Sequence, residues 1–473
     1  VRRSMARAFI LGGVVLTALA LFALAVDLQL DAVRSIQLDV RCPVQARSLA
    51  YAERLHVREA STEKESLTLV VSQFEWELLQ AAGLGCTLLG PHSPIGLRQL
   101  VPAGYQSMSE IWDRMNATAQ AFPDIAAMVD MAPYPPGVSL LGNAMAVLKI
   151  SDNVADDEDE PNILINSEHH AREVVTPVIA LYIIDQLTQN YASDAAIQAF
   201  VDNNQIYVAP LWNPDGYNFM YEVDYNWRKN RAHNEGGSRG VDLNRNYDLG
   251  WNSTCGGSII PPSETYRGPS VASEPETQTM VSFSSGRHLN KQLDFHSYGR
   301  EVLYGYDCTE MYAPLAAFVE EEAIALAKQA NYAIRVPSAD GEHPQWNTKY
   351  VGSYAYLVET STEFQPPYEE AVEEAERVWP LVTAFLERPF PVQGHITDAD
   401  SGQPLMATFT VASSVTGEDV GIERTSNSHG FYTLFLPVGS YTISVNAPFH
   451  SSMTVALQVG ASDQVLDITL SSN

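Results

Sequence analysis

The sequence has 473 residues, and its 57 acidic residues outnumber its 28 Lys and Arg residues, which gives a formal net charge of -29. This length exceeds one ordinary domain. The acidic balance excludes a nucleic-acid partner, because phosphate binding requires clustered Lys and Arg, and it favours solubility and calcium binding.

Residues 1–25 have the pattern of a secretory signal peptide. The basic stretch VRRSMAR precedes an apolar run from Ala8 to Val26, and the small-residue sequence ALA at 23–25 provides a cleavage site. Alternatively the run stays uncleaved as an anchor, the one interpretation that places the chain at a membrane. Both interpretations export the protein, so we expect it to be secreted, periplasmic or attached to the cell surface.

Residues 26–100 are expected to form a small α+β module with its linker. The stretch SLTLVVSQFEWELLQAAGLGCTLLG predicts a strand, a short helix and a second strand. The Pro- and Gly-punctuated stretch GPHSPIGLRQLVPAGY follows as a linker exposed to proteolysis. Four cysteines fit an exported chain, and pairing Cys42 with Cys86 and Cys255 with Cys308 keeps each bridge inside one predicted domain, whereas unpaired buried thiols are the alternative.

Residues 101–389 are predicted to form an α/β domain. The runs NILINS, QIYVAPLW, QLDFHS and YAYLVET indicate buried strands, and TPVIALYIIDQLTQNY and APLAAFVEEEAIALAKQANY indicate amphipathic helices. Thr176 is expected to cap the first of these helices, with Pro177 at its first position. The alternation predicts a mixed, mostly parallel central sheet flanked by helices.

Residues 390–473 have a different pattern. GHITDADSGQPLMATFTV, GFYTLFLPVGSYTISVNAP and VLDITL are short alternating segments broken by Gly and Pro, and Arg424 is the only Lys or Arg after Pro391. This pattern predicts an all-β sandwich of about seven strands.

Polar residues recur immediately after the predicted strands of the α/β domain. They are His170, Asn213, Asp215, His296 and Glu359. In open α/β sheets the ligand crevice lies beyond the carboxyl ends of the strands, so we expect these side chains to share one rim.

A zinc site explains these positions together. Zinc in hydrolases commonly takes two His and a carboxylate and leaves one position for water. His170 and Glu173 supply two ligands if the chain turns between them, and a distant His supplies the third. His169 and His170 point in different directions, so at most one of them shares a face with Glu173. Taken alone the His-x-x-Glu pattern is weak, since a partly buried histidine and a capping glutamate also explain it.

Seven ordered motifs carry a resemblance to a known family. EHHAREVVTP, NPDGY, NWRKNRA, GVDLNRNYDLGW, PPSETYRG, LDFHSYG and YLVET occur in the order and rough spacing of the zinc metallocarboxypeptidases of the carboxypeptidase A type, and the set looks closest to the secreted bacterial carboxypeptidase T group. The resemblance covers about residues 105–388. It implies the zinc carboxypeptidase fold and an exported monomeric enzyme that hydrolyses the C-terminal bond of peptides and proteins, using a zinc-bound water and a glutamate base.

The resemblance also assigns roles to residues. It implies that one catalytic zinc ion is held by His170, Glu173 and His296, with His169 as a neighbour that could orient a ligand. It makes Glu359 the general base, and it makes Arg228 the group that polarises the scissile carbonyl.

Substrate contacts are implied in the same way. Asn244 and Arg245 match the pair that grips the terminal carboxylate of the substrate, a task that suits the two-pronged guanidinium, and Arg172 resembles an accessory contact. Glu342 falls where an acidic residue would favour a C-terminal Lys or Arg, although Asp340 is close. Basic, apolar and broad preferences all stay open.

One expected residue is missing from the motif set. The family carries a substrate-binding tyrosine nine positions before the tryptophan that matches Trp346, but Pro337 occupies that position. Tyr332, Tyr350 and Tyr354 are candidates to replace it, and the sequence does not choose among them.

Further modules are implied outside these motifs. The loop SDNVADDEDEP resembles a calcium site of the carboxypeptidase T group through Ser151, Asp152, Glu158 and Glu160, although a solvated acidic run explains it equally well. Residues 26–100 resemble an inhibitory prosegment, which implies a zymogen, and 390–473 resemble the transthyretin-like carboxypeptidase-regulatory sandwich.

Two other functions fit less well. One is a zinc amidase or cell-wall peptidase of the same fold, and the other is a noncatalytic calcium-dependent binding protein. Asn244 and Arg245 favour the carboxypeptidase, because they provide for a free terminal carboxylate.

Overall fold

The computed structural model describes residues 101–473 together with 37–43, 56–61, 66–72, 76, 80 and 86–91. The chain divides into two compact units, Val1–Gln99 with His233–Arg239 and Leu100–Ala232 with Gly240–Asn473. The predicted signal peptide lies outside the described residues. Within the described part, no helix is both long enough and apolar enough to cross a membrane.

The first unit contains an antiparallel sheet in the order β2-β3-β1-β4. Its strands are β1 (Gln37–Pro43), β2 (His56–Ser61), β3 (Ser66–Ser72) and β4 (Thr87–Pro91). Arg41 lies opposite Thr87, so the adjacent positions 42 and 86 also face each other. This register is compatible with the predicted Cys42–Cys86 bridge, but the Cys42 side chain lies outside the described residues and the bridge stays a prediction.

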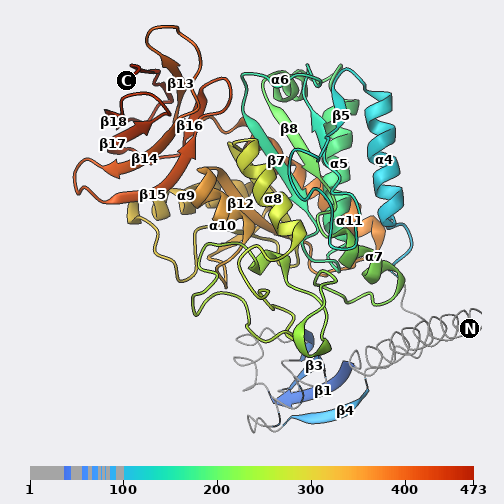
Figure 1. Ribbon diagram of the computed structural model, residues 1–473. Helices are drawn as coiled ribbons and strands as arrows, with labels where there is room; N and C mark the ends of the chain where they lie inside the picture. The colour runs from blue at the N-terminus through green and yellow to red at the C-terminus, as the bar shows by residue number, and fades with distance from the viewer. Residues whose placement is uncertain are drawn as a thin grey trace, which may run out of the picture. The chain divides into compact units, whose positions relative to one another are not determined.

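The second unit is built on an eight-stranded sheet in the order β11-β10-β12-β9-β7-β8-β6-β5. Strands β12, β7, β8 and β5 of this sheet are labelled in Figure 1. The four central strands are mutually parallel: β12 (Tyr354–Thr360), β9 (Lys291–Ser297), β7 (Asn162–Ser167) and β8 (Gln205–Ala209). The outer strands are β5 (Ala126–Met128), β6 (Leu148–Ile150), β10 (Glu301–Leu303) and β11 (Ala333–Arg335). Antiparallel pairs join β10 to β12, β6 to β8 and β5 to β6, so the predicted mixed, mostly parallel sheet is confirmed.

Helices cover both faces of this sheet because its strands bury side chains on alternate sides. Ile163 and Ile165 of β7 belong to one apolar core, whereas Leu164 belongs to the other. The first core also includes residues of α4 (Met108–Ala121), α5 (Val175–Gln189), α6 (Ala195–Asp202), α7 (Pro214–Glu222), α9 (Ala313–Ala330) and α11 (Tyr368–Glu387). The second includes residues of α8 (Pro275–Gly286) and α10 (His343–Trp346).

The predicted cap of α5 is wrong. The helix begins at Val175, and Val174 occupies the cap position without a side-chain hydrogen bond. Turn bonds from the Glu173 N–H to the His170 carbonyl and from the Thr176 N–H to the Glu173 carbonyl already curl the chain before Thr176. The Thr176 hydroxyl instead donates to Glu168 Oε2 at 3.1 Å.

The C-terminal segment is all-β, as predicted, but it contains eight strands rather than about seven. Two sheets face each other across one apolar core, in the orders β16-β13-β19, with β20 also on β13, and β15-β14-β17-β18. The strands are β13 (Val392–Asp398), β14 (Thr408–Ser413), β15 (Asp419–Thr425), β16 (Phe431–Leu434), β17 (Gly439–Asn446), β18 (Met453–Val459), β19 (Gln464–Val465) and β20 (Ile468–Leu470).

Arg424 joins this sandwich to the α/β domain. Its guanidinium, 2% exposed, donates to the carbonyls of Leu289 and Val351 at 2.7 Å and of His288 at 3.0 Å. Burial lowers the pKa of Arg424 to about 9, so the group remains charged at neutral pH. The aromatic rings of Tyr354 and Phe435 also stack across this junction, with centroids 4.3 Å apart. The sandwich is therefore docked by buried contacts rather than tethered.

We expect Arg424→Met to destabilise the protein, because it leaves buried carbonyls of the α/β domain without donors. The loss should be on the order of 3 kcal/mol in the free energy of unfolding. The measurement is the apparent Tm, with Arg114→Met as the control, because the Arg114 ion pair with Asp185 is partly exposed. Equal Tm values for the two variants would contradict the assigned role.

Candidate active site

The carboxyl ends of the central parallel strands carry the predicted residues. His296 lies on β9 and Glu359 on β12, and the two are register neighbours in the parallel pair. His170 and Glu173 follow β7 in the turn that leads into α5. Because parallel strands end at the same edge of a sheet, residues distant in sequence converge here.

Three side chains face one another closely enough to share a metal ion. His170 Nδ1 lies 2.8 Å from Glu173 Oε1, and His296 Nδ1 lies 3.1 Å from both Glu173 Oε2 and His170 Nδ1. All three residues are buried, and they form one of the groups that could hold a metal. Two imidazole nitrogens and a carboxylate are a common zinc set in hydrolases, so the donor chemistry fits zinc.

Two buried aspartates contact the far nitrogens of these histidines. Asp242 Oδ1 lies 3.0 Å from His170 Nε2, and Asp294 Oδ1 lies 3.4 Å from His296 Nε2. A carboxylate behind a ligating imidazole fixes the orientation of the ring. In both histidines the carboxylate lies at Nε2, which leaves Nδ1 facing the shared centre. Neither aspartate was predicted from the sequence, although Asp294 lies two positions before His296 and so shares its strand face.

His169 lies behind the three-residue centre. Its Nδ1 is 3.2 Å from Asp294 Oδ1 and its Nε2 is 3.1 Å from the Tyr247 hydroxyl, and the side chain is fully buried. His169, Asp294 and His296 form a second group of potential ligands. His296 thus lies between the two groups, with Nδ1 toward Glu173 and Nε2 toward Asp294.

Glu359 lies beside the same centre. Its side chain is 19% exposed, and its Oε2 atom has no hydrogen-bond partner among the residues that the structure describes. Burial, reinforced by the nearby Glu173 charge, raises the pKa of Glu359 to about 7. A carboxylate with such a pKa can both take up and release a proton near neutral pH.

Two of the predicted arginines lie beside the centre. Arg228 donates from Nε and Nη2 to Asp242 Oδ2 at 3.2 and 2.9 Å, and its Nη1 lies 3.6 Å from Glu173 Oε1. Arg172 lies 3.6 Å from Glu264, and its guanidinium lies over the Phe364 ring at 4.4 Å from the centroid. Arg228 therefore reaches the centre itself, and Arg172 lies beside an aromatic surface.

Asn244, Arg245 and Glu342 form a connected group. Asn244 Nδ2 lies 3.3 Å from His296 Nε2, and Asn244 Oδ1 accepts a bond from the His343 N–H. Arg245 Nη1 donates to Glu342 Oε1 at 2.9 Å, and both side chains are buried. The sequence did not predict the pairing of Glu342 with Arg245, because the two residues lie 97 positions apart.

Other expected residues have structural roles. The Asn213 side chain accepts from the Gly216 N–H at the start of α7 and donates to the His169 carbonyl. Asp215 accepts bonds from Ser139, Leu141 and Asn143. The polar atoms of both side chains are therefore used by groups of the fold, and the expectation that they share the ligand rim stays a prediction.

The three tyrosines that are candidates for the missing substrate-binding tyrosine have different surroundings. Tyr332 contacts Glu374 of α11, and Tyr354 donates to Glu322 of α9. Tyr350 is partly buried, with its ring 6.0 Å from that of Trp346. Two of the three hydroxyls are thus used by carboxylates of helices that cover the sheet.

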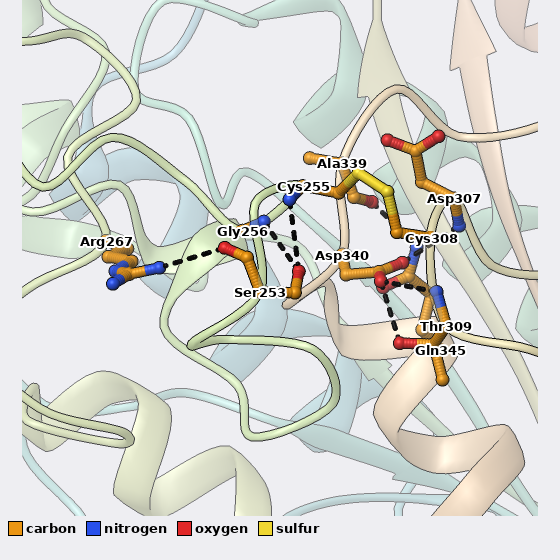
Figure 2. Close-up of a disulfide and its surroundings, with 10 residues drawn as sticks. All are labelled: Ser253, Cys255, Gly256, Arg267, Asp307, Cys308, Thr309, Ala339, Asp340 and Gln345. Atoms are coloured by element: carbon orange, nitrogen blue, oxygen red, sulfur yellow. Dashed lines mark hydrogen bonds between the residues drawn. A yellow bond between two sulfur atoms is a disulfide. The ribbon is translucent and has the colours of Figure 1, made fainter.

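The predicted Cys255–Cys308 disulfide is present, and Figure 2 shows Asp340 beside it. Asp340 is buried and accepts bonds from the Asp307 N–H and from the N–H and hydroxyl of Thr309. The carboxylate therefore fixes the loop that carries Cys308. These bonds distinguish it from Glu342, which pairs with a predicted substrate-binding arginine.

The acidic loop brings its predicted calcium ligands together. Asp152, Glu158 and Glu160 offer carboxylate oxygens within 4.8 Å of one another, and the Ser151 hydroxyl donates to Glu158 Oε2 at 3.1 Å. Burial, with Glu158 and Asp152 close by, raises the pKa of Glu160 to about 7. Three carboxylates this close repel one another unless protons or a cation compensate their charge.

Comparison with known proteins identifies relatives of the α/β domain. A family model described as zinc carboxypeptidase matches residues 111–381. Carboxypeptidase A1 of Rattus norvegicus is 32% identical over 230 residues, covering 48% of this chain and 52% of that protein. A metallocarboxypeptidase A-like protein of Trichophyton verrucosum is 38% identical over 174 residues, covering 36% and 40% respectively. The chain spans about half the length of the curated relatives it matches.

Solved structures share the fold. Carboxypeptidase A from Helicoverpa armigera superposes with a TM-score of 0.61 at 21% identity, covering 75% of this chain and 98% of that one. Thrombin activatable fibrinolysis inhibitor gives a TM-score of 0.59 at 19% identity, covering 74% and 98%. At these identities the likeness shows a common fold.

Proposed function

Because the chain belongs to the zinc carboxypeptidase family, we propose a specific activity for it. We propose that it is a zinc-dependent metallocarboxypeptidase that releases the C-terminal residue of peptides and proteins. The observation that carries the proposal is the convergence of His170, Glu173 and His296 within 3.1 Å of one another, with Glu359 at the same edge of the sheet.

The residues at this centre suit one zinc ion. His170 and His296 would bind through Nδ1 and Glu173 through its carboxylate, with Asp242 and Asp294 orienting the rings. Burial and the Arg228 charge lower the pKa of His170, whereas the Asp294 and Glu173 carboxylates raise the pKa of His296, and metal binding requires both rings in the neutral form. When bound, zinc supplies a Lewis acid that activates water and polarises a carbonyl.

Glu359 provides the proton transfer that peptide hydrolysis needs. Its carboxylate accepts a proton from the attacking water and delivers it to the leaving amine. Arg228, next to Glu173 and Asp242, donates to the oxygen that becomes negative as the carbonyl is attacked, an effect worth about 3 kcal/mol for one donor. Asp242 holds this guanidinium in place.

Recognition of the chain end falls to Asn244 and Arg245, with Arg172 as an accessory contact beside Phe364. A guanidinium binds a carboxylate through two parallel hydrogen bonds, which suits a free C-terminus. This provision favours a carboxypeptidase over an amidase of the same fold.

One experiment tests the proposal. A blocked peptide is incubated with the purified chain, and the products are read by mass as a ladder. We expect sequential loss of C-terminal residues that stops on chelation and returns with zinc. A peptide with an amidated C-terminus is the control, because it lacks the terminal carboxylate. Intact peptide in every condition would favour a binding protein, and cleavage of the amidated peptide alone would favour an amidase.

Glu342 is expected to act through Arg245, because their side chains already form a buried ion pair. We expect Glu342→Gln to raise KM by about 10-fold for all C-terminal residues alike, since Arg245 loses its orienting partner. The measurement is a panel of blocked dipeptides that differ in the last residue. A loss confined to C-terminal Lys and Arg would instead support direct recognition of a basic side chain by Glu342.

The acidic loop is proposed as a calcium site built from Ser151, Asp152, Glu158 and Glu160. Calcium prefers such oxygen donors, and binding would remove the repulsion among the carboxylates. We expect calcium to raise the Tm of the zinc-loaded protein, by an amount equivalent to about 2.7 kcal/mol at a hundred times the Kd. Asp152→Asn is the matched variant, and an unchanged Tm on calcium removal with zinc retained would contradict the site.

The remaining modules are proposed from the sequence. Residues 1–25 serve as a signal peptide, 26–100 as a prosegment, 101–389 as the catalytic domain and 390–473 as a stabilising sandwich. Comparing activity before and after cleavage near residue 100 tests the prosegment. Full activity of the uncut chain would argue against a zymogen.

A further inference from the structure

Glu359 has a cationic neighbour to which neither the motifs nor the mechanism above assign a role. Strand β10 runs antiparallel to β12 and places Glu301 directly opposite Glu359. Strand β11 lies next to β10 and ends at Arg335. Arg335 Nε donates to Glu301 Oε2 at 2.5 Å, and Arg335 Nη2 lies 3.9 Å from Glu359 Oε1. One guanidinium thus lies against two carboxylates.

The strand register explains why a cation is needed at this position. Residues directly opposite on antiparallel strands have neighbouring side chains, and like charges there repel each other. Gly299 lies against both side chains, because a Cβ at this position would lie 3.3 Å from both Glu301 Oε2 and Glu359 Cβ. Glu173 is a further negative charge close enough to act on Glu359.

Hydrogen bonds fix the position of the Arg335 side chain. Its Nε donates to Glu301 and its Nη1 to the Val336 carbonyl, which leaves Nη2 on the side of Glu359. The side chains of Arg335 and Glu301 are 36% and 29% exposed, so both are partly shielded from water. A planar guanidinium can span two carboxylates in this way, whereas an ammonium balances charge without spanning them.

We propose that Arg335, held by Glu301, is a positioning residue that offsets the repulsion between Glu301 and Glu359 and so keeps the Glu359 carboxylate turned toward the zinc ligands. The inference rests on the proposed function and adds a residue to it. Arg335 acts through Glu359 and contacts no substrate atom, so its removal should change turnover rather than substrate binding.

The test compares variants of the full chain loaded with zinc. We expect Arg335→Gln to lower kcat by about 10-fold with KM unchanged, and Arg335→Lys to restore part of the loss. The double variant Glu301→Gln with Arg335→Gln should recover turnover relative to Arg335→Gln, because the repelling charge is removed together with its compensation. Arg114→Gln is the matched control, since Arg114 pairs with Asp185 at the same 2.5 Å distance elsewhere in the protein.

Three results would overturn the inference. The first is wild-type turnover in Arg335→Gln, and the second is a raised KM with unchanged kcat in the same variant. The third is a double variant whose kcat does not exceed that of Arg335→Gln. Tm and bound zinc are measured for each variant, and a kcat loss explained by either also counts against the inference. A wild-type chain without zinc-dependent release overturns the proposed function and this inference together, whereas an active wild type matched by Arg335→Gln overturns the inference alone.

Discussion

Replacing Glu359 by Gln is expected to reduce kcat by about 10³-fold while bound zinc and Tm stay unchanged. The amide has nearly the same shape as the carboxylate but cannot accept a proton from water. Glu359 Oε2 has no hydrogen-bond partner within the described part of the chain, and Oε1 lies 3.9 Å from Arg335, so the substitution weakens one long ion pair and breaks no hydrogen bond of Oε2. The measurement is steady-state hydrolysis of a blocked dipeptide, together with metal analysis of the same sample.

The control for this variant is Glu363→Gln. Glu363 follows Glu359 by four positions and is exposed, so it tests the effect of removing one negative charge from this region. We expect wild-type turnover from the control. Comparable losses in the two variants would indicate a general electrostatic effect and would remove Glu359 from the role of base.

The sheet could be predicted from sequence because its central strands are buried on both faces. NILINS, QIYVA and KQLDFHS are almost wholly buried, and such runs stand out from the amphipathic helices between them. The strand ends then indicate where polar residues gather. His296 and Glu359 follow from this rule, because each lies one position before the end of its strand.

The supporting residues were harder to predict because their partners are not local. Asp242 lies in a loop without periodicity, and its contact with His170 depends on the path of that loop. Arg335 ends a three-residue edge strand, too short to show alternation. Arg424 stands out as the only Lys or Arg after Pro391, but its partners are backbone carbonyls, which no sequence motif marks.

Substituting the adjacent residues His170 and His169 is expected to reduce zinc binding to very different extents. His170→Ala is expected to abolish hydrolysis and to weaken zinc binding by several orders of magnitude, because it removes one of three protein ligands and leaves Glu173 and His296 facing an incomplete site. His169→Ala removes a partner of Asp294 and of Tyr247 but no proposed zinc ligand, so we expect a loss of zinc affinity of about 10-fold to 100-fold. The zinc Kd, measured by competition with a chelator, separates the two cases independently of activity.

A double variant at Asp294 shows whether His169 affects zinc binding directly or through this aspartate, which lies between His169 and His296. If His169 acts by orienting Asp294, the loss of zinc affinity in His169→Ala should disappear in an Asp294→Asn background, where the carboxylate is already absent. An effect of His169→Ala as large as that of His170→Ala, and additive with Asp294→Asn, would mean that His169 binds the metal directly. The ion would then lie in the group formed by His169, Asp294 and His296. Glu173 would no longer be a ligand, because its carboxylate lies on the opposite, Nδ1 side of His296.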